Sequence, residues 1–126
     1  MTTKPQPTQA ELQVLQVLWQ MGEATVKDVH LQLLENHSSG YTTVLKIMQI
    51  MHEKGLVDRD ESSRAHVYSA NITQAETQGR IVKDVVSRVF QGSTSQMLVS
   101  ALNGKTSKKE IAEIREILNQ LEAKSK

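Results

Sequence analysis

The fold of this chain is decided by residues 40–55, GYTTVLKIMQIMHEKG. Apolar side chains recur there at the spacing i, i+3, i+4 and i+7, which predicts a helix that packs one stripe against a core. This stripe consists of Val44, Ile47, Met48 and Met51. The opposite side carries Thr42, Lys46, Gln49 and Glu53. Thr, Lys and Gln can hydrogen-bond phosphates and base edges in a DNA major groove, although any amphipathic helix also keeps a polar face in water.

The residues after this helix have the pattern of a β-hairpin. Residues 56–59 and 65–70 predict two short strands, joined by a polar turn at 60–64. Val67 and Tyr68, in the second strand, are residue types that favour a sheet. A helix that runs directly into a small hairpin is the outline of a winged helix-turn-helix. We therefore predict a mainly α fold with a small β-hairpin wing.

Two further helices are predicted ahead of this region. The first begins at Thr8, because a hydroxyl followed three residues later by Glu11 is the pattern of a capping box, and it ends at Gly22. The second is capped by Thr25 and is broken at 36–40 by loop-forming residues. Their predicted buried sides are Leu12, Leu15, Leu18 and Trp19 in the first, and Val26, Val29, Leu33 and Leu34 in the second.

The second half of the chain predicts two long helices with apolar stripes. They cover residues 73 to about 91 and 107–122, with a loop or short helix at 94–102 between them. The stripes are Val82, Val85, Val86, Val89 and Phe90, and Ile111, Ile114, Ile117, Leu118 and Leu121. A symmetric dimer would remove both stripes from water, whereas the alternative is that these helices fold back on the first half. We predict the dimer.

The predicted organisation is therefore a winged-helix DNA-binding domain at 1–72 and a helical dimerisation domain at 73–126. A length of 126 residues suits one small domain with an assembly appendage. No apolar run approaches the ~18 residues of a membrane span, so no membrane insertion is expected. Residues 1–7 are polar and lack an apolar signal region, so we expect a cytoplasmic protein.

The charge of the chain neither requires nor excludes a nucleic-acid partner. Residues 1–72 carry six Lys/Arg and eight Asp/Glu, giving 6 − 8 = −2, and residues 73–126 carry nine and six, giving 9 − 6 = +3. The predicted DNA-binding half is thus not basic. A winged-helix module that binds a partner protein through the same polar helix face is the alternative function.

Nothing in the sequence predicts an enzyme, a metal site or a cofactor. The absence of cysteine excludes disulfides and thiolate ligands. No HExxH, GxSxG or glycine-rich phosphate loop occurs, so no catalytic constellation can be assembled. The chain has four histidines, none of them closely paired: His30, His37, His52 and His66. His52 and His66 are expected at the surface or in packing.

Arg64 lies in the predicted wing and has two interpretations. Its guanidinium could reach a DNA phosphate or the minor groove, where Arg is favoured. It could instead pair with Asp60 or Glu61 as an ordinary turn residue. The preceding helix favours the DNA interpretation.

Four segments, taken in order, resemble the BlaI/MecI/CopY family of bacterial transcriptional repressors, which includes the penicillinase repressors. They are PTQAELQVL (7–15) with Trp19, GEATVKDV (22–29), YTTV (41–44) through KGLV (54–57), and RAHVY (64–68). The order and lengths of the C-terminal helices also fit, so the resemblance covers essentially the whole chain.

The resemblance implies a homodimeric repressor that places one recognition helix in each half-site of a palindromic double-stranded operator. The candidate DNA contacts are Gly40, Tyr41, Thr42, Thr43, Lys46, Gln49 and Arg64. The candidate dimerisation residues are Val82, Val85, Val86, Val89, Phe90, Ile111, Ile114, Leu118 and Leu121.

The resemblance also suggests how repression would be relieved. In the penicillinase-repressor branch, a membrane metalloprotease sensor cleaves the dimerisation part, and the bond at the similar position here is Ser100–Ala101. That branch has Asn–Phe at the bond, which this chain lacks. It also has basic residues in the recognition helix where this chain has Leu45 and Ile50, so the operator sequence of that branch is not carried over to this chain. The C-terminal cysteines of the copper-responsive branch are absent.

Overall fold

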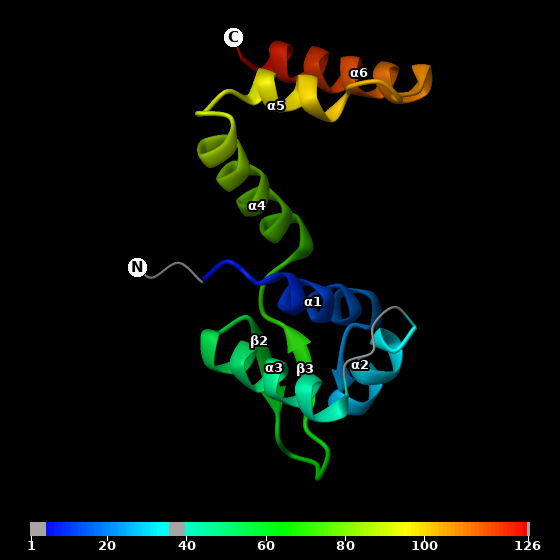
Figure 1. The fold of residues 1–126 in the computed structure, drawn as a ribbon, viewed down its shortest axis with the longest axis vertical. Coiled ribbons are helices and arrows are strands. Elements are labelled where there is room, and N and C mark those ends of the chain that lie inside the picture. Colours follow the sequence, from blue (N-terminus) through cyan, green and yellow to red (C-terminus); the bar gives the residue numbers. More distant parts are fainter. Residues whose placement is uncertain (1–4, 36–39, 126) are drawn as a thin grey trace. The chain divides into compact units, whose positions relative to one another are not determined.

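The structure is a computed structural model that describes residues 5–35 and 40–125 (Figure 1). The predicted loop at 36–40 therefore lies outside the described residues except for Gly40, and so does His37. In chain order the elements are α1 (Gln9–Met21), β1 (Ala24–Thr25), α2 (Val26–Leu33), α3 (Tyr41–Lys54), β2 (Val57–Asp60), β3 (Val67–Ala70), α4 (Gln74–Val89), α5 (Thr94–Ala101) and α6 (Lys108–Lys124).

The chain divides into two compact units, Met1–Val82 and Lys83–Lys126, and α4 contributes residues to both. None of the described helices is long and apolar enough to cross a membrane. The assignment of residues 1–72 to DNA binding and of 73–126 to dimerisation stays a prediction.

The first unit contains a three-stranded antiparallel sheet with the order β1-β3-β2. The hairpin of β2 and β3 was predicted, but its strands begin and end at slightly different residues. Leu56 is not part of β2, because its N–H is used to close the end of α3 by donating to the carbonyl of Met51 at 3.0 Å. The ladder ends at the pair Asp60 and Val67, so Ala65 and His66 belong to the wing turn.

The strand β1 was not predicted. It has only two residues, and these pair with β3 in the register Ala24 to Tyr68 and Thr25 to Val67. Two residues are too few to show an alternating pattern, so this strand is defined by its partner rather than by its own sequence. The pairing brings the start of α2 next to the wing.

Both predicted capping residues of the first unit are confirmed. The Thr8 hydroxyl accepts the N–H of Glu11 at 3.2 Å, and the Glu11 carboxylate accepts the N–H of Thr8 at 2.9 Å. Thr25 and Asp28 form the same reciprocal arrangement at the start of α2. Gly55 ends α3 in the left-handed conformation at φ 80°, which a residue without Cβ adopts at little cost.

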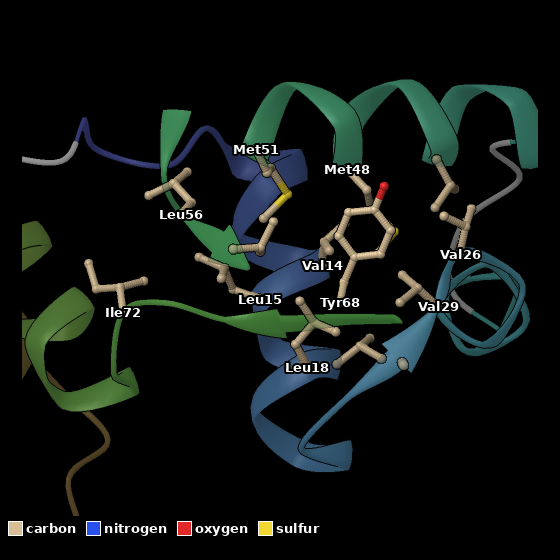
Figure 2. Packing of buried hydrophobic residues seen from close by; sticks show 14 residues of the cluster. Val14, Leu15, Leu18, Val26, Val29, Met48, Met51, Leu56, Tyr68 and Ile72 are labelled. Carbon is tan, nitrogen blue, oxygen red and sulfur yellow. The ribbon is translucent and has the colours of Figure 1, made fainter. Parts of the chain in front are cut away.

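The core of the first unit is apolar and draws on helices α1 to α3 and on all three strands (Figure 2). The predicted stripe of α3 is confirmed, since Val44, Met48 and Met51 are buried and Ile47 packs against the core half-buried. The other buried apolar residues are Val14, Leu15, Val17, Leu18, Ala24, Val26, Val29, Leu56, Val57, Tyr68 and Ile72.

Some of the predicted buried positions were wrong. Leu34 is exposed, because α2 ends at Leu33 and Leu34 serves as its C-cap. Leu12 is only half-buried, whereas Val14 and Val17, which the prediction left out, are buried in its place.

The second unit consists of helices without a buried interior. The region predicted as a loop or short helix forms α5, and Ser107 caps α6 by accepting the N–H of Glu110 at 3.1 Å. Among the described residues from 83 to 125, none is buried in the single chain. The large exposed apolar residues there are Val89, Val99, Ile111, Ile117, Leu118 and Leu121.

Candidate nucleic-acid interface

The helix α3 presents a continuous polar face to solvent. Thr42, Thr43, Lys46 and Gln49 are all exposed, and the buried stripe lies on the other side of the helix. Gly40, the N-cap, is exposed and extended, and its carbonyl accepts the N–H of Val44 at 3.2 Å. The predicted contact residues of α3 therefore share one surface that is free to meet a ligand.

An aromatic contact fixes the N-terminal end of this helix. The rings of His30 in α2 and Tyr41 in α3 meet edge to face, with centroids 5.9 Å apart and an interplanar angle of 89°. Edge-to-face pairs at this separation are favourable because the ring edge carries partial positive charge and the face negative charge. Tyr41 still remains 47% exposed, so part of its ring adjoins the polar face.

The wing carries two acidic residues that already have partners. Arg59 Nη2 lies 2.6 Å from Glu61 Oε2, and the Asp60 carboxylate accepts the N–H of Ser62 at 2.9 Å. The hydrogen bond from Arg59 lowers the pKa of Glu61, and hydrogen bonds from Ser62 lower the pKa of Asp60.

Arg64 lies exposed in the turn between β2 and β3. Within the part of the chain that the structure describes, it makes no ion pair with Asp60 or Glu61. The structure therefore does not contain the ion pair that the second interpretation of Arg64 requires. Its guanidinium is available to an external acceptor.

A groove of about 600 Å³ lies between α3 and the wing. Three of its lining side chains are cationic, namely Lys27, Arg59 and Arg64, and none of its lining residues is Asp or Glu. The remaining lining residues are Thr25, Val26, Tyr41, Leu45, Gln49, Ala65, His66 and Tyr68. This local grouping of cations contrasts with the net charge of −2 for residues 1–72, since 6 − 8 = −2.

Arg59 is held in this groove by two partners. It stands opposite Tyr68 in the ladder of β2 and β3. The hydrogen bond with Tyr68, followed by the one with Glu61, raises the pKa of Arg59 above its usual range. Arg59 is thus a fixed cation at the base of the wing, whereas Arg64, in the wing turn, has no ion-pair partner among the residues that the structure describes.

Sequence reasoning missed Lys27, Arg59 and His66 as members of this surface. Lys27 comes close to the wing only through the pairing of β1 with β3, which had no sequence signal. Arg59 could have been found from strand alternation, because Val57 is buried and Arg59, two residues on, lies on the same face at the sheet edge.

The predicted dimerisation residues lie on the two long helices. On α4 and immediately after it, Val82 and Val89 are exposed and Val85, Val86 and Phe90 are half-buried. On α6, Ile111, Leu118 and Leu121 are exposed and Ile114 is half-buried. Ser100 and Ala101 are exposed at the C-terminal end of α5.

The described residues contain no group of three or more His, Cys, Asp or Glu side chains placed to hold a metal ion. The exposed face of α3 and the groove beside it form a polar and cationic surface. Its chemistry is that of hydrogen bonding and charge pairing with an anionic partner.

Helices α1 to α3 with a three-stranded sheet and its hairpin wing define a winged helix-turn-helix domain, as predicted. The chain belongs to the penicillinase repressor family, whose pattern matches residues 7–120. Members of this family are transcriptional repressors, which confirms the prediction that the chain is not an enzyme.

Relatives of known name extend over almost the whole chain. The penicillinase repressor of Staphylococcus aureus is 22% identical over 116 residues, which is 91% of this chain and 92% of the relative. The penicillinase repressor of Bacillus licheniformis is 25% identical over 117 residues, which is 92% and 91% of the two chains.

Two solved structures resemble the first unit. The DNA-binding domain of the repressor BlaI superposes with a TM-score of 0.53 at 25% identity, covering 60% of this chain and 93% of that chain. Monomeric Bacillus licheniformis BlaI, in complex with the blaP half-operator, gives a TM-score of 0.52 at the same identity and coverage.

Proposed function

We propose that this chain represses transcription by binding a palindromic DNA operator as a homodimer. The observation that carries the proposal is the exposed polar face of α3, with Thr42, Lys46 and Gln49 on one side of a helix whose other side is buried. The related BlaI forms a complex with a half-operator, which supports DNA as the partner of this chain.

In the proposed complex α3 lies in the major groove. Lys46 would donate to guanine or to a phosphate, and Thr42 and Thr43 would donate to phosphates or base edges. Gly40 and Tyr41 would lie next to the DNA backbone at the N-terminal end of α3, where the N–H groups of the protein backbone favour an anion. Gln49 suits adenine, because an amide both donates and accepts hydrogen bonds.

The wing and the start of α2 would contact the DNA backbone beside the major groove. Arg64, which has no partner among the described residues, would reach a phosphate or the minor groove. Lys27 lines the same cationic groove and would add a phosphate contact. Such contacts set the orientation of the domain on the duplex, while the α3 side chains read its sequence.

The homodimer would form through the apolar stripes of α4 and α6. On α6, Ile111, Ile114, Leu118 and Leu121 follow the alternating spacing of three and four residues that suits a helix–helix seam. Leu118 is 52% and Leu121 57% exposed in the single chain. Burial of such side chains contributes roughly 1.5–3 kcal/mol each before entropy costs, so a second copy is a strong candidate to cover them.

Cleavage near Ser100–Ala101 would relieve repression. The bond lies in the last turn of α5, next to Leu102, whose N–H donates to the carbonyl of Leu98 at 2.9 Å. A cut there would separate α6 from the rest of the chain, and losing the tether between two bound domains can lower avidity by roughly 10²–10⁴. A membrane metalloprotease sensor is the proposed partner for this step, and incubation with such a protease followed by mass spectrometry of the fragments tests it.

The proposed function is tested in two steps. The wild-type chain is used to select duplexes from a random-sequence pool, and the binding constant K for the most enriched duplex is then measured at several salt concentrations. Operator binding predicts that one sequence is enriched and that log K falls steeply with log[salt], because each neutralised phosphate releases counterions. The control is the double variant Thr42→Val with Lys46→Ala. Failure of the wild type to enrich any duplex would leave the protein-interaction function as the better account.

A further inference from the structure

One ion pair in the described part of the chain joins two different helices. Lys54 Nζ, in the last turn of α3, lies 2.8 Å from Glu11 Oε2, in the first turn of α1. The other two described ion pairs link residues that are two or four positions apart: Arg59 with Glu61, and Arg88 with Asp84. The pair of Glu11 and Lys54 therefore connects distant parts of the sequence.

Glu11 is unusual because its carboxylate is both buried and fully used. Its side chain is only 5% exposed, and a buried carboxylate is costly unless it is paired and hydrogen-bonded. One oxygen accepts the N–H of Thr8 at 2.9 Å, and the other accepts the ammonium of Lys54. A single carboxylate thus caps α1 and holds the end of α3.

The capping function alone does not require this burial. In the equivalent box at the start of α2, the Asp28 carboxylate accepts the N–H of Thr25 at 3.0 Å and remains only half-buried. Buried ion pairs often contribute little net stability compared with apolar residues of similar volume. The position of Glu11 therefore calls for a role beyond ending a helix.

Lys54 lies at the border between the buried and exposed sides of α3, so rotation of α3 about its own axis would change the distance from Lys54 to Glu11. Met51, three residues earlier, is buried in the stripe, whereas Glu53, one residue earlier, is exposed. The hydrophobic driving force is non-directional and does not by itself fix the rotation of a helix. The ion pair at the border of the stripe is more sensitive to such a rotation, because the energy of a charged hydrogen bond depends on the distance and angle between its atoms.

The C-terminal end of α3 is also held by hydrogen bonds from the sheet side. Asn71 Nδ2 donates to the carbonyl of Gly55 at 3.3 Å, and the Asn71 N–H donates to the carbonyl of Leu56 at 2.9 Å. These bonds fix the chain just beyond the helix. The pair of Glu11 and Lys54 adds a tie from α1 to the helix itself.

We propose that Glu11 is a positioning residue for DNA recognition, which sets the rotation of α3 through the ion pair of its buried carboxylate with Lys54. The inference rests on the proposed function, since it assumes that α3 reads base edges. Glu11 is itself too buried to touch DNA. Its effect reaches the duplex only through the angle at which α3 presents Lys46 and Gln49.

The test compares binding to two duplexes. The first is selected from a random pool by the wild-type chain, and the second has the same base composition in a scrambled order. Glu11→Gln keeps the size of the side chain and the acceptor for Thr8, and removes the charge that holds Lys54. The side chain of Lys54 is 32% exposed, so removing its partner does not leave a fully buried charge, and the variant is expected to fold. Circular dichroism confirms the folded state of each variant before binding is measured.

The expected result is a loss of discrimination. Affinity of Glu11→Gln for the selected duplex should fall about tenfold, while affinity for the scrambled duplex stays within about twofold of wild type, since phosphate contacts are preserved. Glu23→Gln is the matched control, because it makes the same charge change at an exposed site and should leave both affinities unchanged. Lys54→Arg, which keeps the ion pair, should retain discrimination.

A second variant covers the case in which Glu11→Gln does not fold. Lys54→Gln removes the same ion pair at a partly exposed residue, and the same loss of discrimination is expected from it. A folded variant that keeps the wild-type ratio of affinities, or that loses affinity equally for both duplexes, would overturn the positioning role alone. A wild-type chain that enriches no duplex would overturn the proposed function and the positioning role together.

Discussion

The indole nitrogen of Trp19 donates a hydrogen bond to the carbonyl oxygen of Ile72 at 2.9 Å. These residues are 53 positions apart, and the bond joins α1 to the segment that leaves β3 and leads into α4. Ile72 is buried, so its carbonyl has limited access to water when this donor is removed. The bond therefore fastens the end of the wing sheet to the first helix.

Trp19→Phe should destabilise the first unit by about 1–3 kcal/mol, because it deletes the donor and leaves the Ile72 carbonyl unsatisfied. Urea unfolding followed by circular dichroism measures the change. Gln20→Ala, at the neighbouring exposed position, is the control and should stay within about 0.5 kcal/mol of wild type. Equal stability of Trp19→Phe and wild type would show that water replaces the indole.

Leu118→Asp should convert the proposed dimer to a monomer, because it places a charge in the apolar seam that two copies would share. The substitution is compatible with folding of the single chain, in which Leu118 is exposed. Light scattering should give twice the chain mass of 14.1 kDa for wild type and one chain mass for the variant. Asn119→Asp, which adds the same charge to the adjacent exposed residue of α6, should remain dimeric. A wild type that is monomeric at micromolar concentration would contradict the proposed assembly.

Lys46→Ala should weaken binding to the selected duplex by roughly 1–3 kcal/mol if Lys46 reads a guanine, with relaxed preference at one position in each half-site. If Lys46 contacts only phosphate, all duplexes should weaken alike and the salt slope should fall by about one charge per subunit. Fluorescence anisotropy across salt concentrations separates these outcomes. Lys124→Ala, an exposed lysine in α6, is the control. Unchanged affinity for every duplex would remove Lys46 from the interface.

The cap of α2 should make stability depend on pH in the acid range. The backbone N–H of Thr25, followed by its side chain, lowers the pKa of Asp28 through hydrogen bonds. A carboxylate with a lowered folded-state pKa contributes stability above its unfolded pKa of about 4 and loses it as the pH falls towards the folded value. Urea unfolding at neutral pH and at pH 3 should therefore show a smaller acid-induced loss in Asp28→Asn than in wild type. The same loss in both proteins would contradict this assignment.

The stripe of α3 was predictable because one helix carried its own periodic signal, and the caps at Thr8 and Thr25 were predictable because their partners lie three residues away. The strand β1 was not, since two residues acquire their conformation from β3, more than forty residues later in the chain. The place of Lys27 in the groove depends on that strand and was hidden for the same reason. Leu34 misled the prediction because helical spacing continues past the residue at which α2 ends. Local patterns thus located the polar face of α3, whereas the cations around it could be assigned to the same surface only from the folded structure.

The cations of the groove come from three separate places: Lys27 near the start of α2, Arg59 in β2 and Arg64 in the wing turn. Before folding these charges are diluted among the acidic residues of an N-terminal half with a net charge of 6 − 8 = −2. The grouping of these cations is therefore a property of the folded domain, because the pairing of β1 with β3 brings Lys27 beside the wing.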